Sequence, residues 1–397
     1  MTQTTKNALW NAVGNTAYNG LQWLITVIVT RSSLYSSGLL AAAMSVSLTF
    51  RSIAYFGVHD FLVSDARNKY TFSDYWGLRL ITGITAFFLC LIFSFISSYD
   101  TESIYAVMLY MLFRISESFS DLFYSIMQKN DRLDMAGIFM TVKAVVTAIL
   151  FFFGFFSGGL TAALLLMSVS ALVLTFTAEQ QYICKFTHGI TISFLSIKPL
   201  ISEVLPIFIC QIETAVIFNL PQYLISVFFD KAVLGAYASV FSLSLVIQAA
   251  FQYVYTPFVV RFAELSAQKD TVQFRKLILK MIRLLLFITI IFCLFAAIFG
   301  ETIITCLFGS KMLDYSYMIL PLVLSVCCYS AMSFVRVVKI SARNIKAVMI
   351  SHSLGLFISV PLTIAFIRVF GVNGASYGFA AAASITAMSM CVVKKPT

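Results

Sequence analysis

Charged side chains occur at regular spacings within long apolar stretches of this chain. Arg114, Glu117 and Asp121 follow one another at steps of three and four residues, which places them on one face of a helix. Arg51 and Glu213 lie near the middle of two other apolar stretches. A guanidinium suits a phosphate or diphosphate, and a carboxylate can take up H⁺ or Na⁺. The same residues could instead form ion pairs that only hold helices together.

Uncharged polar side chains form two further stripes. One stripe has steps of four, four, three and four residues and consists of Asn11, Asn15, Asn19, Gln22 and Thr26. The other has steps of four residues and consists of Ser244, Gln248 and Gln252. Amides and hydroxyls in such rows can bond the hydroxyls of a sugar, or they can bond a neighbouring helix. Both interpretations require helices to carry the stripes.

The elements that carry these stripes are predicted to be membrane-spanning helices. Of the 397 residues, 60% are apolar and only 11% are charged, whereas a soluble domain has roughly 25% charged residues. About 20 apolar residues in a helix cross a bilayer, and runs such as 144–157 lack the alternation of barrel strands. The chain is therefore predicted to be an all-α polytopic membrane protein. The twelve predicted spans are 8–30, 37–59, 77–97, 104–127, 137–157, 160–183, 201–229, 233–258, 282–300, 315–338, 346–367 and 373–393.

The distribution of basic residues predicts the orientation of these spans. Of the 27 Lys and Arg residues, 21 fall in alternate connections, with Arg79 and Lys143 counted among them, and four fall in the others. The positive-inside rule then places both termini in the cytoplasm. Basic loops that face an anionic leaflet explain the net charge of +10 without nucleic acid. Arg51 and Arg114 lie inside spans, where a charge costs about 2.5–3.5 kcal/mol, so they must face protein or water.

An internal match indicates a duplication. At a shift of 197 residues, the segment 38–48 falls on 235–245, and five of the eleven positions agree. Gly159 and Gly374 also correspond, since each lies before the last span of its half. The match predicts two six-helix bundles, 1–190 and 191–397, with a substrate path between them, as is common in secondary transporters.

A family resemblance runs through nearly the whole chain. It rests on residues 6–31, 36–50, 73–83, 113–137 (FRISESFSDLFYSIMQKNDRLDMAG) and 371–378 (GVNGASYG). In these segments the chain resembles Wzx-type O-antigen and polysaccharide-repeat flippases of the multidrug/oligosaccharidyl-lipid/polysaccharide exporter superfamily. The resemblance implies two six-helix bundles around a central cavity that opens alternately to each side. It also implies flipping of an undecaprenyl-diphosphate-linked oligosaccharide from the inner to the outer leaflet of the bacterial cytoplasmic membrane.

The resemblance also implies which residues face the cavity. They are Arg51, Arg114, Glu117, Asp121, Glu213, Asn11, Asn15, Asn19, Gln22, Gln248 and Gln252. The diphosphate would meet Arg51 or Arg114, the sugars would meet the polar stripes, and H⁺ or Na⁺ would be the coupling ion. Besides the lipid-linked substrate and membrane lipids, a glycan polymerase and chain-length proteins are expected partners. No cofactor or metal is expected, because Cys and His show no ligand spacing.

Three other functions remain open. A multidrug or organic-cation antiporter of the same superfamily would favour an acidic cavity, whereas two predicted spans carry arginine. A membrane glycan polymerase or acyltransferase would need a larger outer loop than the longest predicted one, about 301–314. The chain has no Walker A pattern, so it is not expected to be an ATPase, and an enzyme is disfavoured. The third alternative is a structural or assembly partner in a glycan-export complex.

Overall fold

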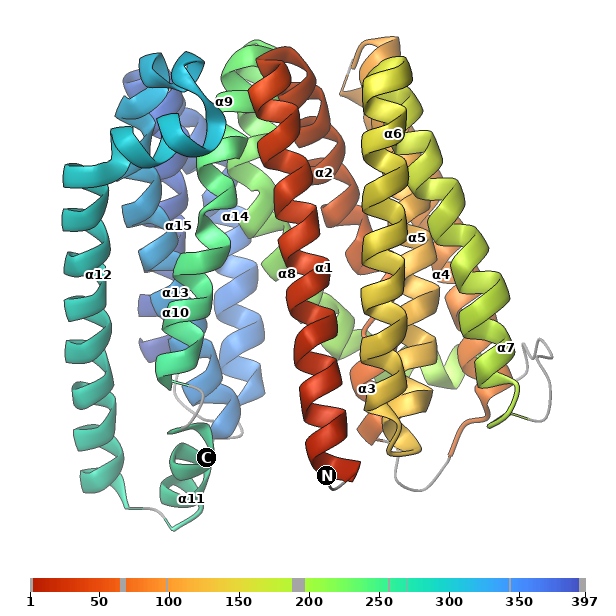
Figure 1. Ribbon diagram of the computed structural model, residues 1–397. Helices are drawn as coiled ribbons and strands as arrows, with labels where there is room; N and C mark the ends of the chain where they lie inside the picture. The colour runs from red at the N-terminus through yellow and green to blue at the C-terminus, as the bar shows by residue number, and fades with distance from the viewer. Residues whose placement is uncertain are drawn as a thin grey trace. The chain divides into compact units, whose positions relative to one another are not determined.

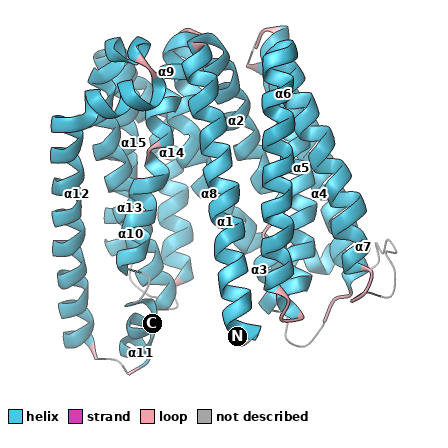
Figure 2. Ribbon diagram, in the orientation of Figure 1, coloured by secondary structure: helices cyan, strands magenta, loops and turns pink. Residues whose placement is uncertain are grey.

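The chain folds almost entirely into helices. The computed structural model describes residues 3–64, 69–97, 99–187, 197–255, 258–268, 270–342 and 344–392. Within these residues every regular element is a helix (Figure 2). The predicted all-α fold class is therefore confirmed. Helices suit these apolar sequences because lipid offers no hydrogen bonds, and a helix bonds its backbone groups within one segment.

Contacts between backbone atoms divide the chain into two compact units. The first unit comprises Met1–Val29 and Leu39–Ala215, and the second comprises Thr30–Gly38 and Val216–Thr397. The division falls within one long helix, α8 (Ile197–Phe228). The predicted boundary at residue 190 lies outside the described residues, so the division into 1–190 and 191–397 stays a prediction.

The first unit contains most of α1 and all of α5, the helices whose sequences carry the polar stripes of the N-terminal half (Figure 1). Besides the first half of α8, its elements are α1 (Gln3–Ser32) and α2 (Leu34–Tyr55), apart from Thr30–Gly38, which belong to the second unit. They are followed by α3 (Val58–Ser64), α4 (Phe72–Ile96), α5 (Thr101–Lys129), α6 (Leu133–Leu174), the π-helix η1 (Thr175–Glu179) and α7 (Gln180–Ile183). The chain reverses within α6 at Gly158 and Gly159, where Gly159 has a φ of 76°. The two arms then pack closely, because a Cβ atom on Gly154 would lie 2.7 Å from the Cα atom of Ala163. α6 therefore holds two predicted spans, 137–157 and the start of 160–183.

The second unit is built from the later helices and the end of α8. Its elements are α9 (Lys231–Ser242), α10 (Ser244–Tyr255), α11 (Val259–Ala267), α12 (Thr271–Phe308), the 3₁₀ helix η3 (Ser310–Met318), α13 (Ile319–Ser341), α14 (Ile345–Phe370) and α15 (Val372–Val392). The predicted span 233–258 is divided between α9 and α10, on either side of Leu243.

Hydropathy alone marks fewer spans than the sequence analysis predicts. Nine helical stretches among the described residues are long and apolar enough to cross a membrane, and one of them, Leu133–Ile183, contains the reversal in α6. α1 and α5 are not among the nine, although they have 30 and 29 residues. These two helices carry the asparagine stripe and the charged stripe. In α5 the charged side chains of Arg114 and Glu117 are buried, whereas Asn15 and Asn19 of α1 are exposed.

Gly38 and Gly235, the first residues of the two segments matched by the internal duplication, contact each other in the second unit. A Cβ atom on Gly38 of α2 would lie 1.7 Å from the carbonyl oxygen of Lys231, and one on Gly235 of α9 would lie 2.3 Å from that of Leu34. Each glycine therefore meets the residue four positions before the other glycine. Ser239 adds hydrogen bonds across this contact, including one of 2.7 Å with Thr30. The start of α2 and α9 thus pack backbone to backbone, as small residues permit in membranes.

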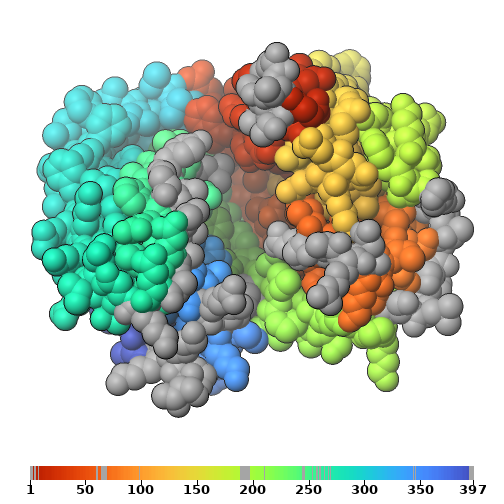
Figure 3. Space-filling view, turned by 90° about the horizontal axis from the view of Figure 1, so that it is seen from below, coloured from red at the N-terminus to blue at the C-terminus, as the bar shows by residue number. Residues whose placement is uncertain are grey.

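The start of α1 is tied to the start of α6 in the first unit. The Asn7 Oδ1 atom accepts a hydrogen bond from the Asp134 backbone N–H at 3.0 Å, and Asn7 Nδ2 donates to the Asp131 carbonyl oxygen. Lys6 forms an ion pair of 3.0 Å with Asp134. One turn further on, a Cβ atom on Gly137 would lie 2.0 Å from a backbone oxygen of α1. Seen from below, the yellow-gold connection between α5 and α6 lies beside the red start of α1 (Figure 3). This anchor sets the register in which α1 passes α6.

Replacing Asn7 with alanine is expected to lower the free energy of unfolding by about 0.5–2 kcal/mol, because a first-turn N–H of α6 loses its acceptor. Lys6→Ala removes a partner of the same carboxylate, but the Lys6 side chain is 45% exposed. That change should cost only about 0–1 kcal/mol. Thermal unfolding of both variants in one detergent provides the measurement. A loss for Lys6→Ala equal to that for Asn7→Ala would contradict the anchoring role of Asn7.

Candidate functional site: a charged cavity in the first unit

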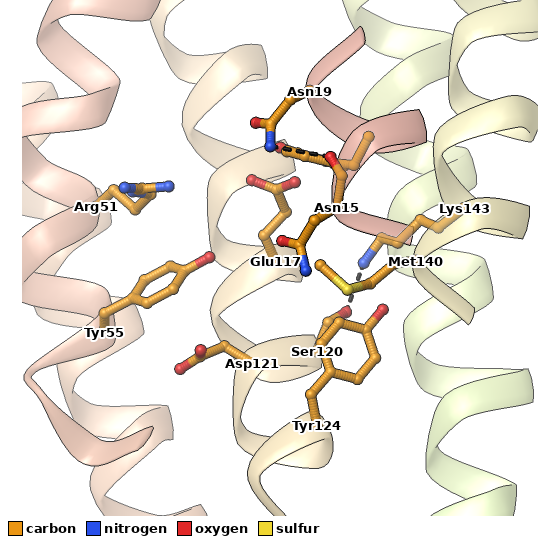
Figure 4. Close-up of a pocket in the computed structure, with 11 residues that line it drawn as sticks. Asn15, Asn19, Arg51, Tyr55, Glu117, Ser120, Asp121, Tyr124, Met140 and Lys143 are labelled. Atoms are coloured by element: carbon orange, nitrogen blue, oxygen red, sulfur yellow. Dashed lines mark hydrogen bonds between the residues drawn. The ribbon is translucent and has the colours of Figure 1, made fainter. Parts of the chain in front are cut away.

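Four elements of the first unit enclose a cavity of about 250 Å³. Figure 4 shows Arg51 and Tyr55 on one side of it, and Asn15, Met140 and Lys143 on the other. The lining residues are Asn15, Tyr18 and Asn19 from α1, Arg51 and Tyr55 from α2, Glu117, Ser120, Asp121 and Tyr124 from α5, and Met140 and Lys143 from α6. The cavity therefore holds both signs of charge among tyrosine and asparagine side chains.

Glu117 is neutralised from its own helix. Arg114 Nη1 donates to Glu117 Oε2 at 2.5 Å, and both side chains are buried. The same guanidinium donates to the hydroxyl oxygens of Tyr18 at 2.8 Å and Tyr110 at 2.7 Å. Arg114 is therefore a buried connector between α5 and α1, and the lining of the cavity does not include it.

Side chains from two other helices contact Asp121. Arg79 of α4, which is fully buried, donates to Asp121 Oδ2 at 3.1 Å and to the Ala54 carbonyl oxygen at 2.7 Å. His59 of α3 places Nδ1 3.0 Å from Asp121 Oδ1. Asp121 and Tyr55 also line a second cavity of about 170 Å³ beside His59. Asp121 therefore lies between the two cavities, and its carboxylate oxygens contact Arg79 and His59.

A third carboxylate lies behind the cavity wall. Glu179 of η1 accepts hydrogen bonds from Ser120 Oγ at 2.5 Å and from Tyr124 Oη at 2.8 Å. Lys143 Nζ lies 4.0 Å from Glu179 Oε1, and it donates to Ser120 Oγ and Thr175 Oγ1 at 2.6 Å each. Lys143 and Glu179 are both buried, so each charge depends on the other for compensation.

Arg51 differs from the other cations of this site. Its guanidinium carbon lies 5.0 Å from the centroid of the Tyr55 ring, and it forms no ion pair with any carboxylate in the described part of the chain. Its side chain is partly exposed to the cavity. Because Glu117, Asp121 and Glu179 each have a cationic partner, Arg51 leaves the cavity with an excess of positive charge.

The structure brings together only part of the predicted site. Arg51, Glu117, Asp121, Asn15 and Asn19 line the cavity. Asn11 and Gln22 belong to the same stripe of α1 but lie outside the lining, and the Asn11 side chain accepts a hydrogen bond from Asn15 at 3.0 Å. Glu213 is buried on α8, whereas Gln248 and Gln252 lie on α10 in the second unit, where Gln252 is exposed. None of these last three residues lines this cavity.

Two assignments of basic residues were wrong. Arg79 and Lys143 were counted in cytoplasmic connections, but both are buried within helices of the first unit. Glu179 was not predicted to belong to the site at all. Arg79, Lys143 and Glu179 all fall within the predicted spans 77–97, 137–157 and 160–183. A charged residue inside a predicted span is costly in free energy unless it has a partner. This cost could have identified all three residues as members of a buried charged site.

The number and length of the apolar helices define a multi-pass membrane protein, and charged side chains lie buried among them. Among the described residues no cluster of His, Cys, Asp and Glu has the arrangement of a metal site.

Sequence comparison identifies the family. The chain belongs to the polysaccharide biosynthesis protein family, whose profile matches residues 4–262 and so covers every residue of the cavity. It is 24% identical over 251 residues to the capsular polysaccharide biosynthesis protein CapF of Staphylococcus aureus. That match spans 62% of this chain and 62% of the length of CapF.

Structure comparison identifies the fold. The chain is similar to the lipid II flippase MurJ in an inward closed conformation, with a TM-score of 0.74 and 16% identity over 96% of this chain and 86% of MurJ. It is also similar to an inward-facing multidrug resistance MATE transporter of the MOP superfamily, with a TM-score of 0.67 and 13% identity over 98% of this chain and 92% of the transporter. The chain therefore shares the fold of these two membrane proteins, and the family match together with this fold confirms the predicted resemblance.

Proposed function

We propose that this protein is a flippase that moves an undecaprenyl-diphosphate-linked oligosaccharide from the inner to the outer leaflet by alternating access. One observation carries the proposal beyond the family. The cavity contains a cation, Arg51, without a carboxylate partner in the described part of the chain, while each carboxylate of the site is already paired. A site with this charge balance favours an anionic ligand, and a guanidinium matches the geometry of phosphate oxygens.

The lining residues suggest how the head group is divided among them. Arg51 contacts the diphosphate at the cavity wall formed by α2. Asn15, Asn19 and the tyrosine hydroxyls offer hydrogen bonds to sugar hydroxyls, which a polar ligand requires once it leaves water. Arg114 was the other predicted contact to the diphosphate. Because its Nη atoms already bond Glu117 and two tyrosines, we assign Arg114 to positioning α1 and Glu117.

The cellular setting belongs to the same proposal. The protein acts in the bacterial cytoplasmic membrane with both termini in the cytoplasm, and H⁺ or Na⁺ drives the cycle. Repeat units that reach the outer leaflet would pass to a glycan polymerase and its chain-length proteins. An O-antigen or a related surface polysaccharide is the expected product.

A multidrug or organic-cation antiporter is the second candidate. The fold supports it as well as it supports a flippase, because MATE transporters share this architecture. A cationic drug, however, needs an acidic site, and Glu117 and Asp121 are both held by arginine side chains. The charge balance of the cavity therefore favours the flippase.

Deletion of the gene tests the proposal. The lipid-linked oligosaccharide is extracted from the deletion strain, and its leaflet is determined with a membrane-impermeant reagent. Completed repeat units that accumulate on the cytoplasmic face, with loss of surface glycan, are the expected result. Unpolymerised repeat units on the outer face would instead indicate a glycan polymerase. Unchanged glycan with new sensitivity to cationic dyes would indicate a drug exporter.

A further inference from the structure

One buried carboxylate has no part in the contact between Arg51 and the head group. Glu179 is 1% exposed and lies behind the cavity wall, whereas its neighbours Ser120, Tyr124 and Lys143 line the cavity. We propose that Glu179 is a proton-binding site that exchanges protons with the cavity through Ser120, and that its protonation frees the charge of Lys143 to act on an anion in the cavity. This inference deepens the proposed function and rests on it for the transport experiment alone.

The geometry of the lysine makes this exchange feasible. Lys143 Nζ donates to two neutral oxygens, Ser120 Oγ and Thr175 Oγ1, at 2.6 Å, and its carboxylate partner stands back at 4.0 Å. The ammonium group is therefore held in place without direct contact with Glu179. Since Lys143 lines the cavity, its charge can be hydrated from there when Glu179 becomes neutral. Protonation of Glu179 then costs less than breaking a directly bonded buried pair.

A single hydroxyl connects the carboxylate with the cavity. Ser120 Oγ lies 2.5 Å from Glu179 Oε2 and lines the cavity on its other side. A proton from cavity water binds Ser120 Oγ while the proton of the Ser120 hydroxyl passes to Glu179 Oε2. One proton is bound, the carboxylate becomes a neutral acid, and serine is restored. Tyr124 keeps its hydrogen bond to the other carboxylate oxygen, Oε1.

Among the acidic groups around this site, Glu179 is the one that takes the proton. Ser120 and Tyr124 face it from α5, Lys143 faces it from α6, and Thr175 lies on its own π-helix. Glu117 of α5 acts on the neighbouring Tyr124 and Lys143. Glu117 is bonded directly to Arg114 at 2.5 Å, so its carboxylate already has a charged partner in contact. The π-helix is itself a local distortion of the kind found at functional sites, and it holds Thr175 and Glu179 on either side of the lysine.

The charge change has a direct consequence for the ligand. With Glu179 ionised, Lys143 is compensated and Arg51 alone attracts an anion. With Glu179 protonated, Lys143 becomes a second attractive charge, so the proton and the anionic head group each strengthen the binding of the other. Protonation of Glu179 should therefore promote capture of the head group, and deprotonation should promote its release.

Infrared difference spectroscopy of the purified protein in nanodiscs tests the proton site without any substrate. On acidification, the wild type should develop the C=O stretch of a carboxylic acid that is lost in Glu179→Gln, and Glu301→Gln, a change at an exposed glutamate, should retain it. Tyr124→Phe should move this band to a higher frequency, because the C=O oxygen Oε1 loses its hydrogen-bond donor. The Tyr124 variant decides the matter if Glu179→Gln does not fold. A band that persists in Glu179→Gln, or a band at unchanged frequency in Tyr124→Phe, would overturn the assignment.

A transport experiment separates this inference from the proposed function. Proteoliposomes that hold a lipid-linked oligosaccharide are given a pH gradient, and the flipped fraction is measured. The wild type should respond to the gradient, and Glu179→Gln should lose that response because the site is fixed in the neutral form. A Glu179→Gln variant that responds like the wild type would overturn the coupling role. A wild type that titrates at Glu179 but flips no lipid would support the proton site and overturn the flippase.

Discussion

Arg51→Ala is expected to abolish most lipid translocation while the protein remains inserted and abundant. A hydrogen bond to a charged group is worth about 1.5–3 kcal/mol, so the loss should be roughly ten- to a hundredfold. Arg51 is the one described cation of the cavity without a carboxylate partner, and its removal leaves no buried acid uncompensated. The effect should therefore fall on transport and leave folding intact. The measurement is the leaflet distribution of the lipid-linked oligosaccharide in a deletion strain that carries the variant.

Three matched variants sharpen this experiment. Arg51→Lys keeps the charge but cannot form the bidentate hydrogen bonds of a guanidinium with a phosphate, so it should restore transport only in part. Arg261→Ala removes an exposed arginine of a surface ion pair and should transport like the wild type. Arg114→Ala should instead reduce the amount of folded protein, because Glu117 is left buried without its partner. Wild-type transport by a well-inserted Arg51→Ala protein would show that Arg51 does not bind the phosphate.

Gly38→Ala and Gly235→Ala are each expected to destabilise the second unit by about 1–3 kcal/mol, the usual cost of overpacking. An added Cβ atom would lie 1.7 Å from the Lys231 carbonyl oxygen in the first variant and 2.3 Å from that of Leu34 in the second. These neighbours are backbone atoms, so the start of α2 and α9 must move apart to accept a methyl group. Thermal unfolding of the purified variants in detergent provides the measurement.

Gly20 supplies a matched control for these glycines. It lies in the helix α1, and a Cβ atom there would meet nothing within 4 Å. Gly20→Ala should therefore gain about 0.5–1 kcal/mol, because alanine favours the helix over glycine. The double variant Gly38→Ala/Gly235→Ala should lose less than the sum of the single losses, since both changes open one contact. Unchanged stability in either single variant would contradict the close approach of the two helices.

Several features of this protein followed from local sequence. Each span is a run of apolar residues, and the free energy of burying such a run in lipid depends on the run alone. The contact between Arg114 and Glu117 was open to prediction in the same way. Residues three apart on a helix are neighbours whatever the helix packs against, and the structure shows this ion pair. The stripe of α1 likewise placed Asn15 and Asn19 on one face.

Tertiary packing decided which charges meet across the cavity. Arg79 reaches Asp121 from α4, and Lys143 lies beside Glu179, which comes from η1. The helical periodicity of the sequence gives the direction of a side chain around its own helix axis. The helix that this side chain contacts depends instead on close approaches between helices, such as that of Gly137 to α1. The sequence therefore indicated that charges lie among the spans, whereas the fold paired the carboxylates and left Arg51 facing the cavity. Ion pairs between helices are long-range contacts, and no local pattern encodes their partners.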